Sequence, residues 1–243
     1  MHKFLFPLAA GLAIISGAAY AADLSYKPPQ IVAPAPEAFG GAGAYFTLHG
    51  GALWVGSVAT DMSTGTYVGD TSTKMGYRVG GSIGYDFNSS FGAEAEVSYG
   101  GVGLNAYTCS VGFCGIPSNA ALTGNASLLT VMGNLILGTQ MGAFHPYVGV
   151  GAGAADLSLS VPDGQFGPDG VKANNWTWAA QAFVGVDLAL TKNVSLGGRY
   201  RYQYVGATNF MDLGDVTHVP APVALGGFGA QSIEAVLKVR FGG

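Results

Sequence analysis

Residues 194–204 read Val-Ser-Leu-Gly-Gly-Arg-Tyr-Arg-Tyr-Gln-Tyr, and they decide the fold that the sequence predicts. Tyrosine alternates there with charged or amide side chains, at the two-residue period of a β-strand. Tyr200 and Tyr202 therefore fall on one face, and Arg199 and Arg201 fall on the other. The pattern predicts a strand with one apolar and one charged face.

The composition of the chain agrees with a glycine-rich β protein. Among 243 residues, 49% are hydrophobic, 10% are charged and 40 are glycine, whereas soluble domains carry about 25% charged residues and about 7% glycine. Glycine costs about 1 kcal/mol per helix position relative to alanine, which argues against a bundle of membrane helices. A net charge of −4 and a pI near 5.4 exclude nucleic acid as a partner, because that binding needs a basic face. Two classes remain: a β protein with an apolar core, or a β-barrel that contacts lipid.

Residues 1–21 have the pattern of a secretory signal peptide. A basic start at Lys3 precedes an apolar run, and Ala19-Tyr20-Ala21 is an A-x-A cleavage pattern. The uncharged residues 4–22 are long enough for a retained membrane anchor, but no basic stop-transfer flank follows them. We expect cleavage after Ala21 and export of the mature chain.

Residues 22–42 are predicted to form a Pro/Ala-rich periplasmic linker. Four prolines lie among alanines without a hydrophobic period: Pro28, Pro29, Pro34 and Pro36. Proline at this density favours an extended, semi-stiff chain. The segment is either a floppy N-terminus or a spacer or contact arm in the periplasm.

Residues 43–243 repeat the alternating pattern in eight segments. We predict strands at 45–55, 76–87, 91–100, 127–138, 144–155, 176–190, 194–204 and 231–241. Short connections (88–90, 139–143, 191–193) alternate with long ones (56–73, 101–126, 156–174, 205–229). In outer-membrane barrels the short turns are periplasmic, the long loops are external, and aromatic girdles mark both interfaces. The sequence therefore predicts an all-β, eight-stranded antiparallel up-and-down transmembrane barrel with both termini in the periplasm.

The charged residues inside the predicted strands all share one parity. They are Arg78, Asp86, Glu94, Glu96, Asp187, Arg199, Arg201, Glu234, Lys238 and Arg240. A register slip of one residue would exchange the two faces, and a basic side chain facing lipid costs about 2–4 kcal/mol at the midplane. A soluble β-sandwich fits the same alternation, with its apolar face inside. Export, an outward face rich in Tyr and Trp, and the low total charge favour the barrel.

The ten inward charges predict a closed lumen. Five are basic and five are acidic, so their sum is zero. An eight-stranded barrel is just wide enough for its interior side chains to fill it, and a buried unpaired charge costs several kcal/mol. We therefore expect a plug of paired charges in which Glu94 and Glu96 engage Arg199 or Arg201 near mid-depth. A wide channel is the alternative.

No catalytic or metal site is predicted. Residues 80–84, Gly-Gly-Ser-Ile-Gly, match G-x-S-x-G, but that motif needs a strand-to-helix elbow and here lies within a predicted strand. His49, His145 and His218 are far apart in the sequence and show neither ligand spacing nor a triad arrangement. We expect no cofactor.

Cys109 and Cys114 are predicted to form a disulfide in the second long connection. They are the only two cysteines of the chain, and an exported protein meets an oxidising compartment. Closing so small a loop contributes about 2 kcal/mol. A redox-active pair is disfavoured because the spacing is not C-x-x-C.

Five strings along the mature chain carry a family resemblance. They are Ala22-Asp23-Leu24, Ala44-Tyr45-Phe46 with Gly50-Gly51, Pro146-Tyr147-Val148-Gly149-Val150-Gly151, Gly198-Arg199-Tyr200-Arg201-Tyr202 and the terminal Phe241. In these strings and their order, the mature chain resembles the small outer-membrane β-barrel proteins of alphaproteobacteria, the opacity-like surface antigens or "porin family". The resemblance implies a monomeric barrel inserted by the outer-membrane assembly machinery, which recognises a terminal aromatic such as Phe241. Gly242 and Gly243 follow Phe241, which departs from the family pattern.

The function expected from these features is structural. We expect a non-enzymatic integral protein of the outer membrane that maintains the envelope and displays loops at the cell surface. Its expected partners are outer-membrane lipid, lipopolysaccharide and the assembly machinery. Two alternatives remain: a surface ligand-binding or adhesin-like barrel for haem or a host molecule, and a small diffusion channel of the porin type.

Overall fold

The computed structural model describes residues 42–62, 67–109, 120–162, 171–210 and 223–241. The predicted signal peptide and all of the predicted linker except Ala42 lie outside these residues. No helix in the described segments is long and apolar enough to span a bilayer.

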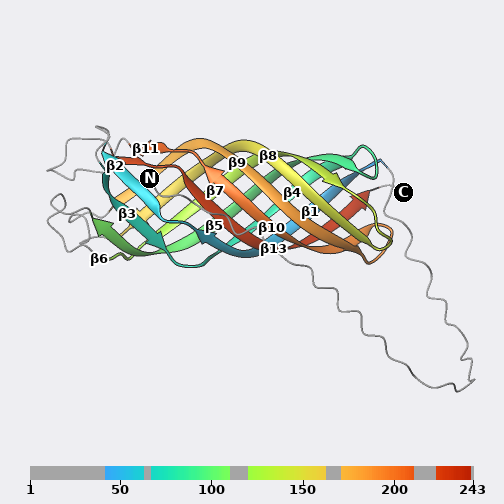
Figure 1. Ribbon diagram of the computed structural model, residues 1–243, viewed down its shortest axis with the longest axis horizontal. Coiled ribbons are helices and arrows are strands. Elements are labelled where there is room, and N and C mark those ends of the chain that lie inside the picture. The colour runs from blue at the N-terminus through green and yellow to red at the C-terminus, as the bar shows by residue number, and fades with distance from the viewer. Residues whose placement is uncertain (1–41, 63–66, 110–119, 163–170, 211–222, 242–243) are drawn as a thin grey trace, which may run out of the picture. The chain divides into compact units, whose positions relative to one another are not determined.

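Eight long strands close into a ring. They are β1 (Gly43–Val55), β4 (Gly76–Asp86), β5 (Phe91–Cys109), β7 (Asn125–Gly138), β8 (Phe144–Val161), β9 (Val171–Ala189), β10 (Val194–Val205) and β13 (Phe228–Phe241). Each pairs antiparallel with the preceding and following ring strands, and β13 pairs with β1 to complete the circle. The tilted ring is visible in Figure 1. The predicted eight-stranded antiparallel barrel is confirmed.

The two ends of the barrel differ in their connections. At one end, here called the turn end, the ring strands are joined by the short segments 87–90, 139–143 and 190–193. The first of these is tightened by Asn88, whose Oδ1 accepts hydrogen bonds from the backbone N–H groups of Ser90 and Phe91 at 2.8 Å. The opposite end, here called the loop end, carries the long connections.

Five shorter strands extend the wall at the loop end. They are β2 (Val58–Met62), β3 (Tyr67–Thr73), β6 (Ala120–Ala121), β11 (Thr208–Phe210) and β12 (Val223–Leu225). They pair in the order β11-β12-β2-β3-β5, and β6 pairs with β5. Figure 1 shows β2, β3, β6 and β11 gathered at this end. The wall of the barrel therefore continues beyond the ends of β1, β4, β10 and β13.

The apolar parity class faces outward over most of the ring. Ile83 is 68% exposed, Val150 is 59% exposed and Leu137 is 57% exposed, whereas Glu96 and Arg201 are almost fully buried. A soluble sandwich buries its apolar face, so this arrangement contradicts the sandwich alternative. We call the outward band that includes Ile83, Leu137 and Val150, and that is bounded by aromatic residues at both ends, the apolar belt.

Interior glycines make room for aromatic rings that lie across the narrow bore. A Cβ atom added to Gly84 would come within 2.3 Å of the Tyr45 ring, and one added to Gly149 would come within 2.2 Å of the Phe183 ring. Both distances are far inside van der Waals contact, so only glycine fits opposite each ring. Alternation of small and large inward residues is how small barrels fill their interior.

Several predicted strand ends at the loop end were wrong, although those at Val55 and Gly76 are confirmed. Four predicted connections, 56–73, 101–126, 156–174 and 205–229, are partly strand, since β5 runs to Cys109, β8 runs to Val161, β9 begins at Val171 and the five short strands add more. Beyond the apolar belt the two faces exchange character. On β8, Ala155 and Leu157 are buried inside, while Ser160 is exposed outside. An outward apolar pattern therefore stops at the belt although the strands continue.

Candidate functional site

The middle of the lumen holds three arginines and three glutamates in one network. Arg201 donates from Nη1 to Glu96 Oε1 and from Nη2 to Glu234 Oε2 at 3.1 Å. Arg78 lies 3.6 Å from both of those glutamates, Nη2 to Glu96 Oε1 and Nε to Glu234 Oε1. All four side chains are almost completely inaccessible. Because each carboxylate meets two guanidinium groups, the desolvation cost of burying these charges is offset by pairing.

Arg199 joins the same network from the turn side. Its Nη1 lies 3.7 Å from Glu96 Oε2 and 3.9 Å from Glu94 Oε1. The structure thus brings Glu94 and Glu96 together with Arg199, and Glu96 together with Arg201. It also adds Arg78 and Glu234, for which the sequence offered no particular partner.

Neutral amides complete the central network. Asn134 Nδ2 donates to Glu94 Oε1 at 3.0 Å and to Glu96 Oε2 at 3.2 Å, and Gln181 Nε2 donates to Asn134 Oδ1 at 2.7 Å. Gln203 Oε1 accepts from Arg78 Nη1 at 2.5 Å. Sequence reasoning missed these three residues because it followed charges only. Their shared inward parity is the signal that could have found them.

A second charged group lies nearer the turn end. Asp86 Oδ2 accepts hydrogen bonds from Lys238 Nζ at 3.1 Å and from Arg240 Nη2. Lys238 Nζ also lies 3.7 Å from the centroid of the Tyr45 ring. Asp187 is buried as well, but its Oδ1 has no hydrogen-bond partner among the described residues. The ten predicted lumen residues therefore form two clusters, with Asp187 outside the direct ion pairs.

Aromatic rings cover the central network on its turn side. The Arg199 guanidinium carbon lies 4.6 Å from the centroid of Phe183 and 5.7 Å from that of Tyr147. Tyr147 Oη also accepts a hydrogen bond of 3.3 Å from Arg199 Nε. A guanidinium held over ring faces gains cation–π stabilisation in a desolvated site. The rings and the charges therefore contact each other inside the barrel.

Little space remains inside this level of the lumen. The cavity lined by Tyr45, Glu94, Tyr147, Arg199 and Lys238, among others, has a volume of about 10 Å³. A cavity needs at least about 10–15 Å³ to hold one water molecule. This cavity is therefore too small for a continuous column of water.

The loop-end half of the interior is apolar. A polar layer, in which Arg78 Nη2 donates to Ser98 Oγ at 2.6 Å, borders this half. On its loop-end side, buried apolar residues form one cluster of Val58, Leu128, Met132, Ala155, Leu157, Ala179, Val205 and Phe228, and another of Leu53, Val102 and Ala230. A nearly wholly apolar cavity of about 80 Å³ lies among them. Burial also raises the pKa of Tyr107, which belongs to a neighbouring cluster with Leu104. The interior of this half is thus packed mainly by apolar side chains.

The comparisons with known proteins agree with this architecture. The family model described as "Outer membrane protein beta-barrel domain" matches residues 8–241. The chain belongs to this outer-membrane β-barrel family. No curated protein matches it.

Solved structures of other outer-membrane barrels have a similar fold. OprG from Pseudomonas aeruginosa is 14% identical, with 82% of this chain and 97% of that chain covered and a TM-score of 0.52. Neisserial surface protein A is 19% identical, with coverage of 83% and 99% and a TM-score of 0.47. At these identities the likeness concerns the fold alone. The apolar belt of this outer-membrane barrel is accordingly its lipid-facing surface.

Two of the remaining sequence candidates, Ser82 and His49, lie on the paired strands β4 and β1 and face the lumen. Ser82 of the G-x-S-x-G string is on β4, without an elbow; its Oγ is 2.5 Å from Thr47 Oγ1 and donates to Glu94 Oε2 at 2.9 Å. His49 Nε2 lies 3.8 Å from Glu96 Oε1. In the part of the chain that the structure describes, no three His, Cys, Asp or Glu residues are arranged to hold a metal ion.

Three predictions fall at or beyond the limits of the described residues. Cys109 ends β5 and Cys114 lies outside them, so the disulfide stays a prediction. His218 also lies outside them. Phe241 ends β13, is 60% exposed and pairs with Ala44 of β1. Its role as an assembly signal stays a prediction.

Proposed function

We propose that this outer-membrane protein is an ion-tight barrel that stabilises the envelope and holds β-structure at the cell surface. The central network carries the proposal: three arginines, three glutamates and the rings of Tyr147 and Phe183 lie in the bore, and the cavity beside Glu94, Arg199 and Tyr147 is about 10 Å³. An ion crossing this level would have to displace paired charges that have no alternative solvation. A structural role suits such a closed lumen better than diffusion does.

Planar-bilayer recording tests the closed lumen directly. The refolded full chain should give no stable unit conductance, while a conducting porin in the same bilayer serves as the positive control. A gel shift between boiled and unboiled protein, measured on the same sample, verifies that the barrel is folded. Stable, large unit conductance from the folded protein would overturn the proposal in favour of the channel.

The proposal places the loop end outside the cell and both ends of the barrel domain in the periplasm. It is supported by the connections, because short turns face the periplasm in barrels of this class, and β1 begins and β13 ends at the turn end. In a background with both cysteines replaced by serine, Asn105→Cys should react with an impermeant maleimide on intact cells. Lys192→Cys, in a short turn, should react only after the outer membrane is permeabilised. The reverse pattern would contradict the orientation.

In this proposal the protein acts as a monomer and catalyses no reaction. Ser82 is engaged by Thr47 and Glu94 inside the lumen, where an external substrate has no route through the central network. The adhesin-like alternative needs a ligand site at the loop end. The apolar cavity there, about 80 Å³, is well below the roughly 300–1,000 Å³ of pockets for drug-sized ligands, which disfavours haem inside the barrel.

A further inference from the structure

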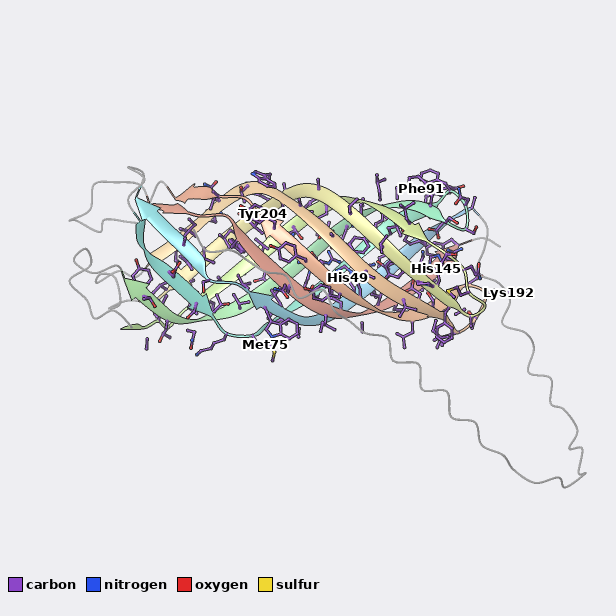
Figure 2. All side chains as sticks on the ribbon, in the orientation of Figure 1. His49, Met75, Phe91, His145, Lys192 and Tyr204 are labelled. Carbon is purple, nitrogen blue, oxygen red and sulfur yellow. The ribbon has the colours of Figure 1, made fainter. Side chains whose placement is uncertain are left out.

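A hollow lies on the outer wall of the barrel, at the loop end. Its volume is about 690 Å³, within the roughly 300–1,000 Å³ range of ligand pockets. Tyr77 and Tyr99 lie at its lower rim with their side chains exposed, and Met75 lies beside them. Figure 2 shows Met75 pointing away from the barrel. The hollow is therefore separate from the lumen.

Two cross-strand rows of small or polar residues form the floor of this hollow. Strand register places Gly101, Ser127, Ser158 and Asn174 in one row, and Gly103, Asn125, Ser160 and Lys172 in the next. All eight residues line the hollow. Glycine and serine leave the surface low, and a Cβ added to Gly103 would meet only the Lys74 side chain, at 3.6 Å.

A lysine stands at each end of the second row. Lys172 ends the row on β9, and Lys74 precedes β4 and donates its backbone N–H to Gly103 O at 2.8 Å. Four strand steps separate the two lysines, or about 19 Å at 4.8 Å per step. Of the eight Lys and Arg residues in the described segments, five point into the lumen and Lys192 lies in a short turn. Of the two that remain, Lys172 lines the hollow, and the Lys74 side chain lies next to it, 3.6 Å from a Cβ placed on the lining residue Gly103.

The depth of the hollow matches the headgroup layer of the membrane. Tyr77 and Tyr99 contact each other, with ring centroids 6.3 Å apart, and belong to the aromatic girdle that ends the apolar belt. Girdle aromatics lie at headgroup level in outer-membrane barrels. The residues above them, Gly, Ser, Asn and Lys, are those that meet polar headgroups. Among the described residues, the carboxylate of Asp156 is half-buried and does not line the hollow.

We propose that this hollow binds the phosphorylated sugar headgroup of an outer-leaflet glycolipid. Lys74 and Lys172 pair with phosphate groups at the two ends of the sugar, the asparagine and serine side chains hydrogen-bond its hydroxyls, and the acyl chains run down the apolar belt beside Tyr77 and Tyr99. The location in the outer leaflet rests on the orientation proposed above. The site does not depend on the lumen being closed. A conductance measurement that overturns the closed lumen would therefore leave the lipid site standing, and loss of the lipid site would leave the closed lumen standing.

The charge requirement is tested with lipid A as the probe, by native mass spectrometry of the folded full chain in detergent. Lipid A should bind more tightly than its monophosphoryl form. Lys74→Gln and Lys172→Gln should each weaken binding roughly fivefold, and the double variant more than tenfold, because each lysine near an anionic headgroup contributes about 1 kcal/mol. Lys192→Gln removes the same charge at the opposite end and should leave binding unchanged.

The shape requirement is tested by filling the hollow. Gly103→Phe places a ring on the floor of the hollow, in ordinary contact with the Lys74 side chain. It should abolish lipid A binding while the boiling-dependent gel shift is retained. Gly198→Phe is the matched control, because Gly198 is on the outward face of β10 and a Cβ there meets nothing within 4 Å. It should bind lipid A as the unmodified protein does.

Four results would overturn the assignment. The first is that the double lysine variant binds lipid A as tightly as the unmodified chain, and the second is that the matched controls lose as much lipid A binding as the test variants. The third is that equimolar inorganic phosphate displaces lipid A, and the fourth is that the protein forms a dimer that Gly103→Phe abolishes. The third would indicate a simple anion site. The fourth would assign the hollow to a second copy of the chain.

Discussion

Strand β5 passes through two environments, and its two faces exchange roles between them. In the apolar belt Glu94 and Glu96 point inward while Ala95 points outward to lipid. Farther along the strand Val102 and Leu104 are buried inside the barrel, and Asn105 is exposed outside. Alternation of apolar and polar residues therefore identifies a strand. Which of the two faces is apolar identifies the medium that surrounds it.

The two halves also hold together by different physical effects. In the belt the outer face is apolar because its solvent is hydrocarbon, and the interior coheres through ion pairs and hydrogen bonds such as Arg201 to Glu234. At the loop end the outer face meets headgroups and water, and burial of residues such as Leu157 and Phe228 supplies the stabilisation. The following variants separate the two effects, in order of decreasing expected size.

Glu96→Ala should give the largest loss of stability. It removes the carboxylate shared by Arg78, Arg199 and Arg201 and leaves buried positive charge without compensation. Breaking such a pair costs about 3–5 kcal/mol, measured as the free energy of unfolding in urea with a lipid or detergent host. Glu96→Gln, which keeps the shape and part of the hydrogen bonding, should lose less. A loss below about 1 kcal/mol for the alanine variant would show that the network contributes little.

Leu157→Ala should destabilise the loop end by about 2–5 kcal/mol through a lost apolar contact and a cavity. Leu157 belongs to the cluster with Leu128 and Phe228, which lies beyond the ion network. Hydrogen exchange should therefore accelerate in residues 155–161 and their partners on β9, while amides in the belt stay protected. Acceleration spread evenly over the whole barrel would mean that the two halves are one cooperative unit.

An outward arginine should distinguish the two media on a single strand. Ala95→Arg places the charge in the middle of the apolar belt and should cost about 2–4 kcal/mol of unfolding free energy. Asn105→Arg makes the same change on the outer face of the loop end and should stay within about 0.5 kcal/mol, as for ordinary surface substitutions. Similar costs at both positions would contradict the assignment of lipid to one and water to the other.

The predicted disulfide should contribute least. Cys109→Ser should lower stability at the loop end by about 2 kcal/mol if the bond closes the small loop to Cys114. A thiol assay on denatured protein purified without reductant should find no reactive thiol before reduction and two thiols after it. Two thiols before reduction would exclude the bond.

Parity along the strands predicts the ring, its short turns and the inward set of charges, because a charged residue facing lipid is costly enough to mark the register. The belt residues Arg199 and Glu94 show this well. Parity does not predict the loop-end parts of β8 and β9 as strand, because the apolar residues there, such as Leu157, are buried inside the barrel and the outward positions are no longer apolar.

The partner of each charge follows less directly from the sequence. Arg78 on β4 and Gln203 on β10 meet across the lumen although 125 positions separate them. Such pairs depend on how closure of the ring staggers the strands, which no single segment encodes. The position of Asp187 outside the direct ion pairs is likewise set by this stagger.

The exchange of faces at the girdle has a mechanical consequence for insertion. If the barrel sank deeper, the lysines at positions 74 and 172 and the half-buried Asp156 would enter hydrocarbon; if it rose, the lipid-facing rings of Tyr77 and Tyr99 would leave the interface that suits them. Both displacements raise the free energy, so the outer wall itself fixes the height at which the barrel rests along the membrane normal.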